Sequence, residues 1–111
     1  MSEAVIGSAQ ETAERLAPLL KEYAEKLRAL NERAMEAQDL GERGRARAGS
    51  LTMRGVAHEY TLLSSAVLEL SRMASQLVEH ADLDRVTQIE LKLRVAELDG
   101  IFAEAQRLEL A

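Results

Sequence analysis

Apolar residues recur through the first third of the chain at alternating spacings of three and four. This spacing is typical of a helix that packs against other helices along one seam. The seam comprises Ile6, Ala9, Ala13, Leu16, Leu20, Tyr23, Leu27, Leu30, Ala34 and Ala37. It predicts a helix over about residues 9–39, with a kink near residues 14–18 or a restart with Pro18 in the first turn. Gly41 follows, and a glycine in the left-handed conformation commonly ends a helix.

A second apolar stripe with the same spacing follows a segment rich in glycine and arginine. Its members are Met53, Val56, Tyr60, Leu63, Val67, Leu70, Ala74, Leu77 and Ala81. The stripe predicts a helix over about residues 51–81, with Ser50 or Thr52 as its N-cap. Few charged residues interrupt it, and the apolar face is widened by Leu62, Ala66, Leu68, Met73 and Val78. A helix this apolar is normally covered on more than one side.

The last third carries two apolar stripes at once. One contains Val86, Ile89, Leu93, Ala96, Gly100 and Ala103, and the other contains Leu91, Val95, Leu98, Phe102 and Ala105. They predict a helix over about residues 83–110 that is apolar on two faces. The preceding HADLDR supplies acidic residues suited to cap a new helix, which favours a break near residues 81–84. The alternative is one long helix over residues 51–110, because neither glycine nor proline intervenes.

These patterns predict one all-α domain over residues 1–111, folded as an antiparallel three-helix up-down-up bundle with heptad-like packing and completed by self-association. The alternative is a two-helix hairpin that dimerises as a four-helix coiled coil. The residues nominated for a helix–helix interface are Leu63, Val67, Leu70, Leu77, Ile89, Leu93, Ala96, Gly100 and Ala103. The competing interpretation is that the small residues of the last helix face the core of their own chain, or that Gly100 marks fraying.

Composition and charge exclude several classes of function. The net charge is −5, and there is no cysteine. An acidic chain disfavours nucleic-acid binding, because phosphates repel it. The first ten residues, MSEAVIGSAQ, lack the basic region and apolar run of an export signal, and no apolar run is long enough to span a membrane. We therefore expect a cytoplasmic protein without membrane contact.

Catalytic and metal-binding patterns are absent from the sequence. Bundle metal sites use Glu-x-x-His pairs, and none of the glutamates precedes a histidine by three residues. His58 and His80 are too far apart on one helix to share an ion. Gly44 to Gly49 has the glycine spacing of a phosphate-binding loop but lacks the lysine that follows it. We expect no enzyme activity and no cofactor.

The connector over residues 41–50 opposes the charge of the rest of the chain. Between Gly41 and Gly55, four arginines stand against a single glutamate. These residues, Arg43, Arg45, Arg47 and Arg54, are the candidates for contact with a small anion or an acidic partner. The competing interpretation is a mobile connector whose arginines are solvated.

The surplus apolar faces favour a non-enzymatic protein–protein interaction module. Such a protein would be an adaptor, a regulator or a small secretion-type chaperone, acting as a homo-oligomer, with a dimer favoured, and binding another protein. One alternative is an enzyme or ligand sensor that binds a small anion through the connector. Another is a subunit of a structural assembly.

Overall fold

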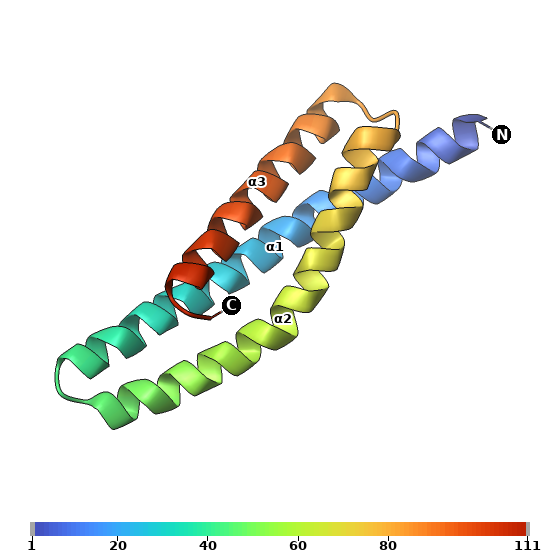
Figure 1. The fold of residues 1–111 in the computed structure, drawn as a ribbon. Coiled ribbons are helices and arrows are strands. Elements are labelled where there is room, and N and C mark those ends of the chain that lie inside the picture. The colour runs from blue at the N-terminus through green and yellow to red at the C-terminus, as the bar shows by residue number, and fades with distance from the viewer. Residues whose placement is uncertain (1, 111) are drawn as a thin grey trace.

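The chain forms a three-helix bundle. The computed structural model describes residues 2–110, with side chains placed for residues 8–45 and 47–110. The described residues form α1 (Ser2–Glu42), α2 (Ala46–His80) and α3 (Arg85–Arg107), which run up, down and up (Figure 1). Every pair of helices is in contact. The predicted all-α three-helix fold is thereby confirmed, and the alternative of one helix over residues 51–110 is wrong.

The heptad stripes supply the core. The largest fully buried side chains come from all three helices: Leu20, Leu27, Val56, Val67, Leu91 and Leu98. Burial of such side chains is the main favourable contribution to folding, because apolar surface leaves water. The stripe of the first helix is buried or half-buried from Ala9 to Ala37. The side chain of Ile6, its first predicted member, lies outside the described ones.

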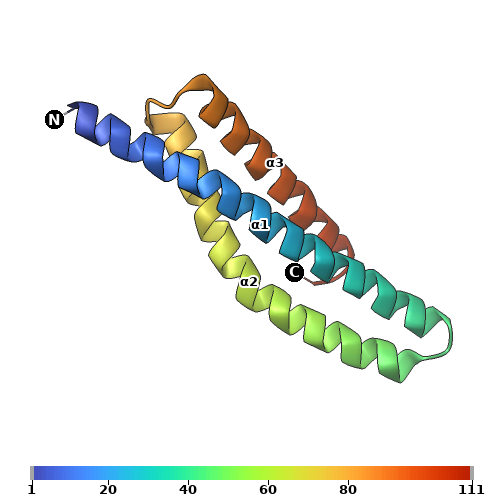
Figure 2. The ribbon, with the colours of Figure 1, turned by 180° about the vertical axis from the view of Figure 1, so that it is seen from behind.

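The helices are unequal in length, so fewer helices lie side by side at the ends of the molecule than in its middle. Its principal axes measure 63, 20 and 17 Å. In both views the N-terminal end of α1 extends beyond the turn between α2 and α3 (Figures 1 and 2). At the other end the α1–α2 hairpin extends beyond the last turn of α3. Three helices therefore lie together only in the middle of the bundle.

Pro18 lies inside α1 without restarting it. The predicted restart at this residue is wrong. Proline removes one backbone hydrogen bond from a helix interior. Its neighbours Leu16, Ala17 and Leu20 are buried in the core, and their packing holds the helix on both sides of the missing bond. Pro18 itself is exposed.

The turn between α1 and α2 occupies residues 43–45 rather than 41–50. Gly44 takes the left-handed conformation, with φ of 82°, where Gly41 was predicted to do so. The N–H of Arg45 donates to the carbonyl of Leu40 at 2.8 Å, and the N–H of Gly44 donates to the carbonyl of Gly41 at 3.2 Å. This pair of bonds is the Schellman motif, which satisfies the free carbonyls at the end of a helix.

The start of α2 also differs from the sequence-based prediction. The helix begins at Ala46, and Arg45 occupies the N-cap position without a side-chain capping hydrogen bond to the described backbone. Ser50 and Thr52, the predicted caps, lie inside the helix. Alanine and arginine are good helix formers, so the helix continues back to the tight turn at Gly44.

The predicted break near residues 81–84 is confirmed, and an acidic residue caps α3. The carboxylate of Asp84 accepts a hydrogen bond from the N–H of Thr87 at 2.7 Å. Gln10 of α1 ties this cap to the rest of the bundle. Its amide oxygen accepts from the N–H of Asp84 at 2.9 Å, and its amide nitrogen lies within 2.9 Å of acceptors on Asp84, Thr87 and Glu14. An amide has two hydrogens, so two of these three acceptors are served at a time.

This cap predicts a pH-dependent contribution to stability. Hydrogen bonds from the side chain and then the backbone N–H of Thr87 hold the pKa of the Asp84 carboxyl below its usual value. A lowered folded-state pKa stabilises the fold above the unfolded-state pKa of about 4, and this contribution is lost as pH falls through the lowered value. Asp84→Asn keeps a good N-cap but cannot ionise. Urea unfolding between pH 7 and pH 2 is expected to show a smaller acid-induced loss for Asp84→Asn than for the parent.

The matched substitution Asp84→Ala removes the capping oxygen itself. It is expected to lower stability at pH 7, where Asp84→Asn changes it little. Parallel pH profiles for the parent and Asp84→Asn would contradict an ionised cap in the folded state.

Candidate protein-interaction surface

One of the two apolar stripes of α3 is exposed to solvent. We call the residues Val86, Ile89, Leu93, Ala96, Gly100 and Ala103 the α3 stripe. All six are exposed, and the large ones have exposed fractions of 76% for Val86, 46% for Ile89 and 63% for Leu93. The other stripe faces the core, where Leu91 and Leu98 are completely buried. The bundle thus uses one apolar face of α3 and leaves the other to solvent.

The nominated residues of α2, in contrast, are buried or half-buried. Val67 is fully buried, and Leu63, Leu70 and Leu77 are half-buried against the core. The structure therefore separates the nominated interface residues into two groups. The members from α2 pack within the chain, whereas the members from α3 point outward.

Two shallow cavities lie in the groove between α2 and α3, beside the α3 stripe. The larger, of about 400 Å³, is lined by Tyr60, Ser64, Leu68, Asp99, Phe102, Ala103 and Gln106. The smaller, of about 230 Å³, is lined by Ser75, Val78, Glu79, Lys92, Val95, Ala96 and Asp99. Because Asp99 borders both cavities and Ala96 and Ala103 belong to the α3 stripe, the stripe and this α2–α3 groove form one continuous surface.

Aromatic packing forms the floor of the larger cavity. The rings of Tyr60 and Phe102 meet edge to face, with centroids 6.3 Å apart and planes at 83°. Burial raises the pKa of the Tyr60 phenol. This contact joins α2 to the C-terminal part of α3 below the groove.

The seam between α1 and α3, in contrast, is closed by polar contacts. The buried side chain of Asn31 donates to the carbonyl of Ile101 at 3.1 Å. Glu97 lies between two arginines, 3.1 Å from Arg28 of α1 and 3.1 Å from Arg94 of its own helix. These polar contacts reinforce the apolar packing of α3 against α1, and the α3 stripe is left in solvent on the side of the helix away from the core.

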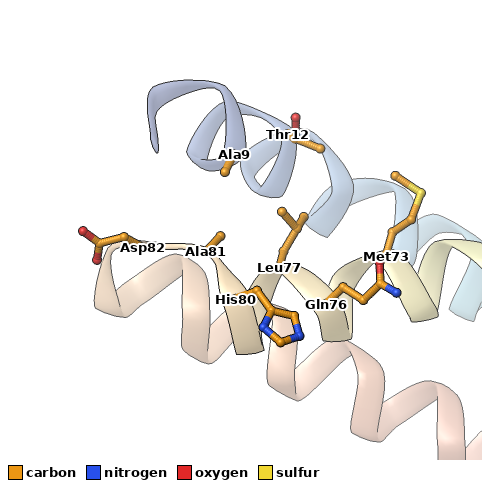
Figure 3. Close-up of a pocket in the computed structure, with 8 residues that line it drawn as sticks. All are labelled: Ala9, Thr12, Met73, Gln76, Leu77, His80, Ala81 and Asp82. Carbon is orange, nitrogen blue, oxygen red and sulfur yellow. The ribbon is translucent and has the colours of Figure 1, made fainter. Parts of the chain in front are cut away.

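A second exposed apolar surface follows the seam between α1 and α2. One groove, of about 540 Å³, is lined by Ala9, Thr12, Met73, Gln76, Leu77, His80, Ala81 and Asp82. Figure 3 shows Leu77 pointing from α2 toward Ala9 of α1, with Gln76 and His80 along the same stretch of α2. Another groove on this seam, of about 480 Å³, borders Leu62, which is 66% exposed. We call these two grooves, with exposed Leu62 and Met73, the α1–α2 face.

The sequence nominated only part of the α1–α2 face: Leu63 and Leu77 line its grooves, but the exposed Leu62 and Met73 were not nominated. The signal was present, because Leu62 and Met73 widen the apolar face of the second helix beyond its heptad stripe. Which neighbours those side chains meet depends on where α1 and α3 lie around α2. The heptad spacing alone leaves that open.

Of the four candidate arginines of the connector, the structure brings only two together. Arg45 and Arg47 border a shallow hollow at the start of α2, with Gly44, Ala48 and Leu51. The guanidinium of Arg43 instead pairs with Asp39 at 3.1 Å, and Arg54 lies exposed further along α2. The four arginines therefore do not converge on one point.

Metal-binding and membrane-spanning features are not found in the described part of the chain. Within residues 8–45 and 47–110, His, Cys, Asp and Glu side chains do not form a group of three that could hold a metal ion. His58 and His80 are both exposed. Among the described helices, none is long and apolar enough to cross a membrane.

Comparison of the chain with protein-family models, with curated proteins and with solved structures found no match. The function is therefore inferred from the surfaces described above. Of these, the α3 stripe is the one where large apolar side chains are most exposed on a single helix face.

Proposed function

We propose that this protein is a non-enzymatic protein–protein interaction module that self-associates through α3. The dimer then presents its α1–α2 faces to another protein, as a small adaptor, regulator or secretion-type chaperone does. The observation that carries the proposal is the exposure of Val86, Ile89 and Leu93 on one face of a helix whose opposite face is buried in the core. Exposed apolar patches on small domains commonly mark binding surfaces.

The apolar surface of this stripe is large enough to offset the cost of self-association. Burying a large apolar side chain contributes about 1.5–3 kcal/mol. A symmetric dimer buries the three large residues of the α3 stripe twice. The gross gain is on the order of 10 kcal/mol, which is comparable with the roughly 4–15 kcal/mol that association costs in lost freedom of motion. Burial of the stripe thus roughly offsets the cost of association, and further contacts along the α2–α3 groove set the concentration at which the dimer forms.

The α1–α2 face suits a partner with an amphipathic helix. Its grooves are lined by residues of two neighbouring helices, and exposed Leu62 and Met73 of α2 are among them. A helix that lays an apolar face into such a groove is a common mode of peptide recognition. If the α1–α2 face instead binds further copies of the chain, the same surfaces build a structural assembly.

The anion-binding alternative receives less support. It requires several arginines around one site, but Arg43 is engaged with Asp39 and Arg54 lies elsewhere on α2. Arg45 and Arg47 remain, both exposed at the start of α2. Exposed pairs of this kind contribute little binding energy in water.

Sedimentation velocity of the full chain across micromolar concentrations tests the proposal. The parent is expected to sediment as a dimer at the upper concentrations. Leu93→Glu places a charge in the centre of the α3 stripe and is expected to give a monomer with unchanged helix content by circular dichroism. Leu62→Glu changes an equally exposed leucine on the α1–α2 face and is the matched control, which is expected to remain dimeric.

Two results would contradict the proposal. A parent chain that is folded and monomeric at all concentrations would show that the protein does not self-associate. A dimer that survives Leu93→Glu but dissociates with Leu62→Glu would move self-association to the α1–α2 face.

A further inference from the structure

We infer that the occupant of the α3 stripe is α3 of a second copy of this chain, arranged antiparallel about a two-fold axis near Ala96. This inference rests on the proposed function, because it assigns the surface and geometry of the self-association. Its starting point is that a symmetric dimer uses the same patch on both subunits, so the patch must be complementary to itself. The α3 stripe meets this condition in three ways: in the sizes of its side chains, in the charged residues on its flanks and in the position of the adjoining α2–α3 groove.

The stripe is graded in side-chain size along the helix. Its N-terminal half contains Val86, Ile89 and Leu93, and its C-terminal half contains Ala96, Gly100 and Ala103. In a parallel pair, large residues would meet large ones at one end and small residues would meet small ones at the other. The two axes would then be forced apart at one end. An antiparallel pair places the large half of each helix on the small half of the other, which keeps the axes at one distance.

Ile89 of the partner subunit then meets the larger cavity of the α2–α3 groove. With the two-fold axis at Ala96, a residue seven positions before it lies opposite a residue seven positions after it. Ile89 of the partner subunit therefore lies opposite Ala103. Ala103 and Gln106 line the cavity of about 400 Å³, together with half-exposed Leu68 of α2. The groove thus accepts Ile89 of the partner subunit beside Ala103.

Charges along the flank nearest α2 are complementary in the same arrangement. Lys92 and Asp99 lie seven residues apart on this flank, and both are exposed. Neither forms an ion pair within the part of the chain that the structure describes. In an antiparallel pair the same flanks of the two helices face each other, so Lys92 meets Asp99 of the partner subunit twice about the axis. A parallel pair would not bring these residues together.

The opposite flank carries Glu90, Glu97 and Glu104. Two of these carboxylates are paired within the chain, Glu97 with Arg28 and Arg94 and Glu104 with Arg107. About the same axis, Glu90 lies two positions from Glu104 of the partner subunit, and Glu97 lies two positions from Glu97 of the partner subunit. Because Arg107 accompanies Glu104, the repulsion between these acids is reduced. This flank therefore opposes the antiparallel pair only weakly.

Cysteine cross-linking of the full chain distinguishes the two arrangements, because the natural sequence has no cysteine. Ala96→Cys places thiols beside each other at the two-fold axis, and mild oxidation is expected to convert most of the dimer into a disulfide-linked species. Ile89→Cys and Ala103→Cys, each alone, hold their thiols about 20 Å apart across the axis. Each alone is expected to cross-link at least tenfold more slowly, whereas an equimolar mixture of the two variants cross-links rapidly.

The outcomes separate this inference from the proposed function. If all three single variants cross-link rapidly, the helices are parallel and the inference is overturned while self-association through α3 stands. If the parent is dimeric and neither Ala96→Cys nor the mixture cross-links, the dimer uses another surface. A monomeric parent overturns both. Sedimentation of the reduced variants, with their circular dichroism spectra, confirms that each substitution at these exposed positions leaves a folded dimer.

Discussion

Replacing Leu98 by alanine is expected to lower the free energy of unfolding by about 2–5 kcal/mol. Leu98 is completely buried in the core, on the face of α3 that the bundle covers. The substitution removes apolar contacts and leaves a cavity that the neighbouring helices fill only in part. Domains of this size have total stabilities of about 5–15 kcal/mol, so the loss is a large share of the whole.

Urea unfolding followed by circular dichroism measures this effect, with Leu51→Ala as the control. Leu51 is 59% exposed on α2, and its truncation is expected to change the free energy of unfolding by less than about 0.5 kcal/mol. The two leucines differ in burial rather than in chemistry. Equal losses for both variants would show that α3 does not pack through the face that contains Leu98.

Gly49→Ala is expected to lower the free energy of unfolding by about 1–3 kcal/mol. Gly49 lies in the first turns of α2, where α1 passes close by. A Cβ atom at this position would lie 2.5 Å from the carbonyl oxygen of Ala37 and 3.2 Å from the backbone nitrogen of Gly41. Both atoms are backbone, so the helices themselves must separate. This strain exceeds the roughly 1 kcal/mol that alanine gains over glycine in a helix.

Gly55→Ala is the matched control in the same helix. No described atom lies within 4 Å of a Cβ atom built at this exposed glycine. Its substitution is expected to raise stability by up to about 1 kcal/mol, because alanine loses less backbone freedom on folding. The two glycine variants therefore change thermal unfolding in opposite directions. A rise in both would contradict the close approach of α1 and α2 at Gly49.

The two turns of the bundle differ in how far the sequence predicts them. The break before α3 was predictable, because an acidic N-cap leaves a local signature and Asp84 fulfils it. The end of α1 was not predictable from local sequence, since Gly41 and Gly44 are both suited to the left-handed conformation. Gly44 takes it, with φ of 82°. The glycine at position 49 suggested a loop, but it serves a close contact between helices.

The exposed apolar surfaces were likewise predicted only in part. The α3 stripe was nominated from its spacing and from the surplus of apolar faces. The nominated residues of α2 are buried or half-buried, with Leu63 and Leu77 lining the α1–α2 grooves. The exposed Leu62 and Met73 of that face were not nominated. Each helix of this chain has more apolar surface than one seam requires. Spacing identifies that surplus but does not say which part of it a neighbouring helix covers.

The sequence by itself determined the helical class, the seams of the first two helices and the cap of the third. These features depend on residues within a few turns of one another, so local spacing and hydrogen bonding decide them. Only the tertiary structure decided between the two apolar faces of α3. Both faces satisfy the same heptad spacing, and the choice between them follows from apolar packing contacts with α1 and α2, which bury Leu91 and Leu98 completely. Those contacts turn Leu98 toward the core and leave Leu93 in solvent.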